Sequence, residues 1–212
     1  KRIVFAEADN QKILKAAQIA FEEGIAYPIL LGDEKKIRSI AQQHNIDIEG
    51  MPIIDPRDDA NEEKRKKFGD IFFKKRQRKG INLYESLKMM KDRNYFGCMM
   101  VETGEADGLI SGLTRNYAEA IRPALQVIGT EEDVQKIAGM YLLLTKRGPL
   151  FLADTTVNFN PTAEELADIT MMVAREVRNF NLTPRIAMLS YSNFGSSASP
   201  EAKLVARAKD IV

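Results

Sequence analysis

The chain has 212 residues, of which 44% are hydrophobic, enough to bury one large core or two small ones. Its 31 basic and 30 acidic residues leave a formal net charge of +1, which argues against a dedicated nucleic-acid-binding protein. The single cysteine excludes an intrachain disulfide framework, and no apolar run reaches the roughly 18 residues of a membrane span. We therefore expect a globular protein of a reducing compartment, the cytoplasm, with no membrane partner.

In the first half of the chain, short apolar segments alternate with amphipathic ones. Strands are expected at residues 3–6, 27–31, 52–55 and 106–110. Helices are expected over residues 10–24, 33–44, 61–79, 83–90 and 95–103. Asp9 or Asn10 is placed to cap the first of these helices. This alternation predicts parallel sheets covered by helices on both faces.

The helix expected at residues 61–79 is strongly basic. Nine Lys and Arg residues surround a seam of apolar side chains. This pattern is typical of a solvated helix face, but it also suits a surface that meets phosphate groups, and both interpretations stand.

The stretch at residues 106–126 reads as a buried strand, a tight Ser-Gly turn and a helix. The helix begins between residues 114 and 117, with Thr114 or Asn116 able to cap it. A strand end followed by a helix N-terminus offers free N–H groups and a positive dipole end, which suits an anion. Arg115 and Arg122 add positive charge nearby. The alternative is an ordinary connection between a strand and a helix.

The second half of the chain continues the alternation. Strands are expected at residues 137–144, 150–153 and 186–190, and helices over 162–180 and from Pro200 onward. Residues 146–149 form either a hairpin or a short connection between the first two of these strands. Thr162 and Glu165 have the spacing of a capping box at the start of the first helix.

Polar side chains follow several of the expected strands. Ser111, Asp154 and Ser190 lie where a strand ends, and ligands of parallel sheets bind at such ends. The loop after the last strand is a second candidate phosphate cradle, with an ordinary solvent loop as the alternative. Its small residues are Ser190, Ser192, Gly195 and Ser196. The glycine patterns of dinucleotide-binding folds and of P-loops are absent.

The chain offers little for a metal ion or a nucleophilic cysteine. His44 is the only histidine, so a multi-His metal site is excluded, and we expect it to be a partly buried structural residue. Cys98 has no partner cysteine and no acid–base neighbour in the local sequence, which is typical of a core cysteine. No metal ligands are predicted.

Five ordered blocks resemble the phosphotransacetylase (phosphate acetyl/butyryltransferase) family. They are KRIVFAEADNQKILKAA, FFKKRQRKGINL, ADGLISG with IRPALQVI, FLADTTVNFNPTAEELADI and PRIAMLSYSNFGS. The resemblance implies two α/β/α domains with mostly parallel sheets and a cleft between them, as in isocitrate and isopropylmalate dehydrogenases. Residues 1–133 would be the first domain, incomplete without a C-terminal return segment, and residues 134–212 the N-terminal part of the second. The C-terminal part would be missing, and the hinge would lie near residues 130–133.

The resemblance also implies site residues. Family members join coenzyme A and an acyl phosphate to give acyl-CoA and phosphate. The arginine of the family's RKxKG block, which meets coenzyme A phosphate, falls on Arg76, and the arginine of its RPA block falls on Arg122. Arg122 and Ser111 are the expected catalytic residues. Coenzyme A or acetyl-CoA would be bound by Arg76, Arg122, Asp154, Ser190, Ser192, Gly195 and Ser196.

Two departures from the family pattern bear on activity. In active transferases the Ser-Gly turn continues through small residues to a histidine, whereas this chain has the bulky segment LTRNY. The family's serine, arginine and aspartate near an NDLSRG motif have no counterpart.

LTRNY and LSYSNFGSS resemble most closely the C-terminal domain of hybrid NADP-dependent malic enzymes. This implies a regulatory domain that senses acetyl-CoA, in a homo-oligomer that is at least a dimer, attached to a malic domain that uses NADP and a divalent metal. The alternatives are an active phosphate acetyltransferase, which forms acetyl-CoA from acetyl phosphate and coenzyme A, and a pure assembly module that binds nothing.

Overall fold

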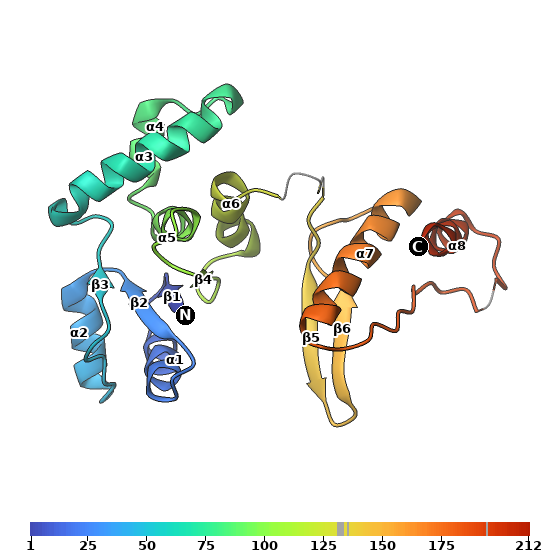
Figure 1. Cartoon of the computed structure of the whole chain (residues 1–212), viewed down its shortest axis with the longest axis horizontal. Helices are drawn as coiled ribbons and strands as arrows, with labels where there is room; N and C mark the ends of the chain where they lie inside the picture. Colours follow the sequence, from blue (N-terminus) through green and yellow to red (C-terminus); the bar gives the residue numbers. More distant parts are fainter. Residues whose placement is uncertain (131–133, 135, 194) are drawn as a thin grey trace. The chain divides into compact units, whose positions relative to one another are not determined.

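The computed structural model describes residues 1–130, 134, 136–193 and 195–212. The chain divides into two compact units, Lys1–Gly129 and Thr130–Val212 (Figure 1). The hinge expected near residues 130–133 falls largely on residues 131–133, which lie outside the described residues. No helix of the described part is long and apolar enough to cross a membrane.

The first unit is built on a four-stranded sheet in which every pairing is parallel. Its strands are β1 (Arg2–Phe5), β2 (Tyr27–Leu31), β3 (Ile53–Ile54) and β4 (Gly108–Ile110), in the order β3-β2-β1-β4. The alternation of strands and helices predicted this parallel sheet, although β3 and β4 are shorter than expected. Because the strands are parallel, β1, β2 and β4 all end at one edge of the sheet, which we call the carboxyl edge.

Six α-helices and two 3₁₀ turns connect these strands. The α-helices are α1 (Gln11–Glu22), α2 (Glu34–Gln43), α3 (Glu62–Arg76), α4 (Leu83–Met89), α5 (Arg93–Glu102) and α6 (Tyr117–Val127). The 3₁₀ turns Asp59–Asn61 and Gln77–Lys79 flank α3, so the helix expected at 61–79 is α-helical only in its middle. Asn10 caps α1 and Asn116 caps α6 through their side chains. His44 is exposed at the end of α2, contrary to the expected partial burial.

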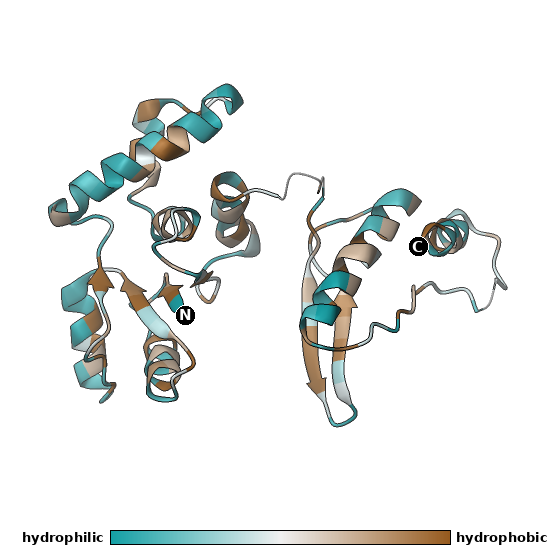
Figure 2. Cartoon of the chain, in the orientation of Figure 1, coloured by the Kyte–Doolittle hydropathy of each residue, from teal (hydrophilic) through white to brown (hydrophobic). Residues whose placement is uncertain are grey.

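The core of the first unit lies on both faces of the sheet because alternate strand residues point to opposite faces. On one face Phe5 and Leu30 pack with Leu14 of α1 and Ile37 of α2. On the other face Val4 and Leu31 belong to a cluster with apolar residues of α3 and α5. The strands are accordingly among the most apolar segments of this unit (Figure 2).

The second unit has an antiparallel hairpin and two helices. The hairpin consists of β5 (Met140–Thr145) and β6 (Gly148–Ala153), and the helices are α7 (Ala163–Asn179) and α8 (Pro200–Ile211). The capping box of Thr162 and Glu165 is present at α7, as predicted. The rings of Phe151 in β6 and Phe180 after α7 have centroids 5.4 Å apart, so the helix packs on the hairpin.

Two expectations for this unit are wrong. Residues 186–190 do not form a strand, and within the described residues β5 and β6 pair only with each other. A strand forms only where a neighbouring strand can bond its backbone N–H and C=O groups. The apolar pattern of residues 186–190 does not show whether such a neighbouring strand exists. The described sheet of this unit is also antiparallel. The turn between Thr145 and Gly148 is far too short for the crossover that parallel strands require.

Candidate active site at the carboxyl edge

Charged residues of the first unit meet at the carboxyl edge. Asp9, just after β1, accepts hydrogen bonds from Nη1 of Arg93 at 2.6 Å and from Nζ of Lys36 at 2.9 Å. Burial raises the pKa of Asp9, but these two cations outweigh it, and the pKa lies below its ordinary value. A Cβ atom at Gly32, the first residue after β2, would lie only 3.2 Å from Nη1 of Arg93. Arg93 thus bonds Asp9 and leaves no room for a side chain at residue 32.

The turn after β4 is held by Glu7, which follows β1. Oε2 of Glu7 accepts hydrogen bonds from the backbone N–H groups of Gly112 and Leu113, both at 2.8 Å. Its Oε1 accepts the N–H of Thr114 at 2.8 Å and also the Thr114 hydroxyl. Burial raises the pKa of Glu7, but these hydrogen bonds together outweigh it and leave the pKa below its ordinary value. The N–H groups that we expected to be free for a bound anion are therefore already occupied.

Ser111 and Arg115 connect the same turn to α5. Oγ of Ser111 donates to Oδ1 of Asn94 at 2.9 Å, and Nη1 of Arg115 bonds Oδ2 of Asp92 at 2.8 Å. Asn94 is fully buried, and its Nδ2 has no hydrogen-bond partner. Asp92 is the N-cap of α5. The bulky segment that departs from the family pattern is thus anchored at the start of this helix.

Arg76 and Arg122 come from different helices, and the charges of both influence the pKa of one side chain, Tyr95. Arg76 ends α3 and Arg122 lies in α6, while Tyr95 of α5 donates its hydroxyl to Oε1 of Gln126 at 2.6 Å. Burial raises the pKa of Tyr95 above its ordinary value, while the positive charges of Arg122 and Arg76 oppose that shift. The two arginines expected to meet phosphate groups are therefore both close enough to affect one phenol group.

Neither arginine is neutralised within the described part of the chain. Arg122 is exposed and Arg76 is half-buried, and neither forms an ion pair with a described carboxylate. Nε of Arg76 is buried without a hydrogen-bond partner. Burying such a donor is costly, so it favours an acceptor that arrives with a ligand. A pair of unpaired guanidinium groups is a suitable site for a phosphate-bearing anion.

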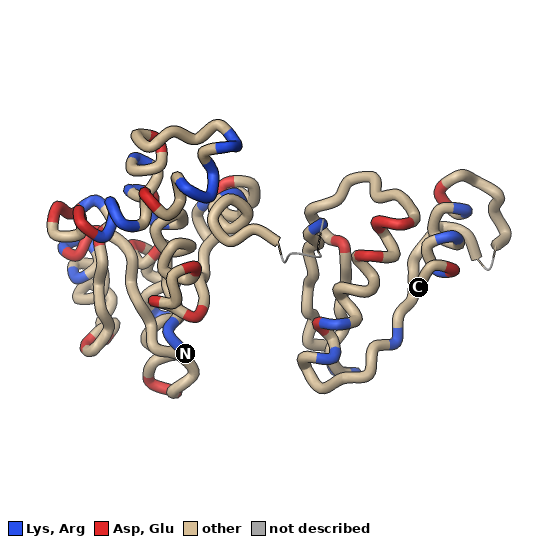
Figure 3. Tube along the Cα trace, turned by 45° about the horizontal axis from the view of Figure 1, so that its top comes forward, with Lys and Arg blue, Asp and Glu red and all other residues tan. Residues whose placement is uncertain are grey.

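The remaining charges along α3 are largely paired. Lys64 bonds Glu105 at 2.5 Å, Lys66 bonds Glu62 at 2.8 Å, and Lys75 bonds Glu102 at 2.5 Å. Figure 3 shows acidic positions interspersed among the basic ones in this unit. The first turns of α3 therefore fit the solvated, ion-paired interpretation, and the interpretation as a phosphate-binding surface is limited to its C-terminal end.

Asp154 organises the turn after β6 in the second unit. Its Oδ1 accepts the N–H of Gly139 at 2.8 Å, and its Oδ2 accepts the N–H of Asn158 at 2.6 Å and its Nδ2 at 2.5 Å. Burial raises the pKa of Asp154. Hydrogen bonds from Gly139, Asn158 and Thr156 outweigh burial, and they lower the pKa of this carboxyl to about 2. The carboxylate is thus charged and internally bonded at neutral pH.

The serine-rich loop before α8 is also bonded within itself. The N–H of Ser192 donates to Oγ of Ser190 at 3.2 Å, and the N–H of Asn193 donates to Oγ of Ser196 at 3.1 Å. Gly195 has a φ of +80°, a left-handed conformation that favours glycine. The expected phosphate-binding residues of this loop therefore sit in hydroxyl-bonded turns, with their side chains on the surface.

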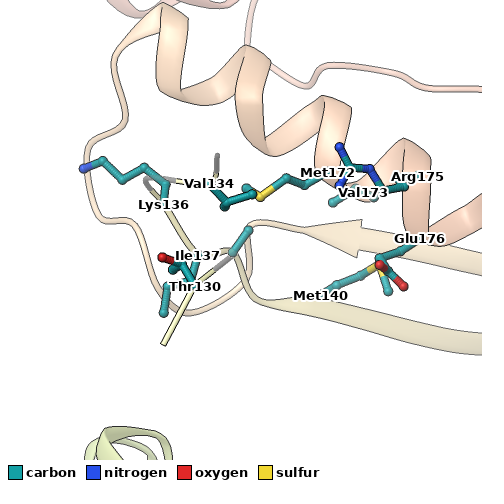
Figure 4. A pocket seen from close by; sticks show the side chains of 10 residues that line it. Thr130, Val134, Lys136, Ile137, Met140, Met172, Val173, Arg175 and Glu176 are labelled. Atoms are coloured by element: carbon teal, nitrogen blue, oxygen red, sulfur yellow. The ribbon is translucent and has the colours of Figure 1, made fainter. Parts of the chain in front are cut away.

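A cavity of about 290 Å³ in the second unit involves none of the expected site residues (Figure 4). Residues before and at the start of β5, and residues of α7, line it, chiefly Val134, Ile137, Met140, Met172 and Val173. Lys136 at its rim bonds Glu165 at 2.7 Å. The lining is mostly apolar, and its charged members are Lys136, Arg175 and Glu176.

The described residues contain no cluster of three or more His, Cys, Asp or Glu side chains suited to a metal ion. Cys98 is only 1% exposed, and burial, helped by the charge of Asp92, raises the pKa of its thiol to about 12. At neutral pH it is therefore protonated and inaccessible, as expected of a core cysteine.

Inspection of the residues alone missed three members of this site: Glu7, Asn94 and Tyr95. Glu7 stands directly after a predicted strand, so the rule that drew attention to Ser111 applied to it equally. Asn94 and Tyr95 lie in the first turn of α5, where the sequence predicted only a helix from residue 95 onward. Their roles come from contacts with residues 17 and 31 positions away, which no local pattern reports.

These features define an α/β protein with a parallel sheet whose carboxyl edge gathers charged and polar side chains, and comparison with known proteins identifies its family. Residues 1–212 match the family model described as "Phosphate acetyl/butaryl transferase". The chain belongs to the phosphate acetyl/butyryltransferase family.

Individual relatives agree with this assignment. The chain is 35% identical to a phosphate acetyltransferase of Clostridium acetobutylicum, with 100% of this chain and 65% of the relative covered. It is also 35% identical to an NAD-dependent malic enzyme of Rhizobium meliloti, over 95% of this chain but only 26% of that protein. A phosphotransacetylase structure from Staphylococcus aureus superimposes with a TM-score of 0.86 at 30% identity, covering 99% of this chain and 62% of the other. The chain therefore spans less than two thirds of the phosphotransacetylases that it matches.

Proposed function

We propose that the protein is a phosphate acetyltransferase, which interconverts acetyl phosphate and coenzyme A with acetyl-CoA and phosphate. The relatives that carry this name favour it over the malic-enzyme interpretation suggested by LTRNY and LSYSNFGSS. The structural observation that supports it is that neither Arg76 nor Arg122 has a described carboxylate partner and that Nε of Arg76 is buried without a hydrogen-bond partner. Acetyl phosphate and coenzyme A both bring phosphate groups that such a pair can bind.

In the proposed reaction the sulfur of coenzyme A attacks the carbonyl carbon of acetyl phosphate. The carbon–sulfur bond forms, the bond from that carbon to the phosphate oxygen breaks, and phosphate leaves with the electron pair while the thiol proton passes to solvent. Arg122 would bind the phosphate oxygens and stabilise their charge in the transition state. Arg76 would bind a phosphate of coenzyme A. Ser111 would lie beside the reacting acyl phosphate, with its hydroxyl proton donated to Asn94.

Further parts of the proposal rest on family membership. We propose two domains of the isocitrate dehydrogenase-like kind, residues 1–133 and 134–212. A homo-oligomer and a cytoplasmic location belong to the same proposal. The second domain would contribute coenzyme A contacts from Asp154, Ser190, Ser192, Gly195 and Ser196.

The test is an assay of the natural full-length protein with acetyl phosphate and coenzyme A. We expect thioester formation at a turnover of about 10 s⁻¹, a typical enzyme value. Titration calorimetry with acetyl-CoA should accompany the assay. If acetyl-CoA binds but no thioester forms at any substrate concentration, the transferase proposal fails.

A second candidate is a regulatory domain of a malic enzyme. It is favoured by the 35% identity to the Rhizobium meliloti protein and by the bulky segment that Arg115 anchors to Asp92. NADP and a divalent metal would then belong to a separate malic domain. Acetyl-CoA would bind without being transferred and would change the rate of malate-dependent NADP reduction. A protein that does not bind acetyl-CoA would instead be the assembly module.

A further inference from the structure

The carboxylate of Glu7 occupies a place where loops of this kind bind external anions. Three successive backbone N–H groups, those of Gly112, Leu113 and Thr114, point to its two oxygens at 2.8 Å each. Gly112 has a φ of +108°, which lets the turn bring these groups together. Successive N–H groups in such a turn form a concave nest for an anion. Here the anion is a side chain of the protein itself.

Glu7 is well placed to be a permanent occupant of this nest. It is only 1% exposed, so the solvent cannot replace it as a partner for the N–H groups without moving the loop. The N–H of the preceding residue, Ala6, donates to the carbonyl of Ile110 at 3.1 Å, which joins the end of β1 to the end of β4. The position of Glu7 relative to the turn is therefore set by the pairing of two strands.

Ser111 lies directly before the nest and is held from its other side. Its Oγ donates to Oδ1 of the fully buried Asn94 at 2.9 Å. Rotation of the Ser111 side chain or a shift of the turn would break either this bond or the bonds to Glu7. A buried carboxylate and a buried amide thus hold this turn from two sides.

We propose that Glu7 is a positioning residue for acetyl transfer: as a built-in anion it fills the nest at residues 112–114 and thereby keeps Ser111 in place for the substrate. The inference rests on the proposed function. It also means that substrate phosphate does not bind in this nest and meets the arginines instead. Glu7 itself does not touch the substrate.

Two substitutions separate charge from packing. Glu7→Gln keeps the size of the side chain but turns an NH₂ group toward a backbone donor. Glu7→Ala empties the nest, and a small carboxylate such as formate then fits the vacated place. We expect Glu7→Ala to lower kcat about 100-fold, the loss that a misplacement of about 1 Å produces. The KM for coenzyme A should change little because Arg76 is untouched.

The experiment is a formate titration of the full-length protein, with sodium chloride at equal ionic strength as the reference. Melting temperature and transfer rate are recorded for wild type, Glu7→Ala, Glu7→Gln and Glu23→Ala. Glu23 is an exposed glutamate, so Glu23→Ala serves as the matched control. Formate should raise both quantities in Glu7→Ala in a saturable way and should leave the other three proteins unchanged. Adding Glu7→Ala to Ser111→Ala should lower the rate no further.

The outcomes are distinguishable. Formate that raises neither quantity in Glu7→Ala, or a Glu7→Gln rate equal to wild type, overturns the inference. The inference is also overturned if the rate of the Glu7→Ala, Ser111→Ala double variant falls by the product of the two single losses. Such independent losses would mean that Glu7 does not act through Ser111. If wild type itself transfers no acetyl group, the proposed function fails. In that case the melting temperatures decide whether Glu7 is the built-in anion.

Discussion

The hydroxyl of Ser111 donates a 2.9 Å hydrogen bond to Oδ1 of Asn94, and the Asn94 side chain is completely buried. This bond joins the end of β4 to the first turn of α5. The next residue of α5, Tyr95, is the one on which Arg76 and Arg122 act. The start of α5 therefore connects the turn that carries Ser111 with the two arginines of the candidate site.

Replacing Asn94 tests how much this connection stabilises the fold. Asn94→Ala leaves the Ser111 hydroxyl without its buried acceptor, so we expect the free energy of unfolding to fall by about 1–3 kcal/mol. Urea unfolding followed by circular dichroism measures it. Gln42→Ala, on the exposed face of α2, is the control and should change stability by less than about 0.5 kcal/mol. Equal stabilities of the two variants would contradict the structural role of Asn94.

Arg76 should contribute to coenzyme A binding. Arg76→Ala removes a guanidinium group whose Nε has no protein partner, so affinity for coenzyme A should fall by about 1.5–3 kcal/mol while stability is retained. Titration calorimetry measures the affinity, with the exposed Arg57→Ala as control. An unchanged dissociation constant in Arg76→Ala would show that this arginine does not meet the cofactor.

Asp154 should make stability depend on pH in the acid range. Its folded pKa of about 2 lies below the ordinary value of 3.8, so the charged form is favoured in the folded state. The resulting stabilisation is complete above the unfolded pKa and is lost as pH falls from about 5 toward 2. Allowing for solvent screening, it amounts to about 1–2 kcal/mol. Urea unfolding between pH 6 and pH 3 should show a smaller decline in Asp154→Asn than in wild type, and parallel declines would contradict this.

Cys98 should be unreactive in the folded protein. With its thiol buried and its pKa raised to about 12, a disulfide reagent should modify it only after unfolding. Thiol titration with and without denaturant tests this, and Cys98→Ala should keep its transfer activity. Rapid modification of the native protein would show that the core around α5 opens.

The local features of the fold could be predicted because their causes are local. Asn10 and Asn116 cap helices through bonds to residues two and three positions away, so the sequence alone places these caps. The repeated alternation of strand and helix likewise predicts the parallel sheet of the first unit. The strand expected at residues 186–190 is absent because strand formation needs a pairing partner, which is a non-local condition.

The candidate site could be predicted only in part, for the same reason. Ser111 and Arg122 stood out by their position near a strand end and by family resemblance. Glu7 reaches residues 105–107 positions away, so its role as the anion of the turn depends on the pairing of β1 with β4. The approach of Arg76 and Arg122 to Tyr95 depends on how α3, α5 and α6 pack.

The central claim is that this protein transfers an acetyl group at a site that contains Arg122. The most direct measurement is kcat/KM for acetyl phosphate, with coenzyme A saturating, in full-length wild type, Arg122→Lys and Arg122→Ala. We expect Arg122→Ala to lose about 1.5–3 kcal/mol of transition-state stabilisation, roughly 10- to 150-fold, and Arg122→Lys to recover only part of it because lysine lacks the bidentate fork. A wild type that forms no acetyl-CoA, or an Arg122→Ala protein as fast as wild type, would contradict the claim.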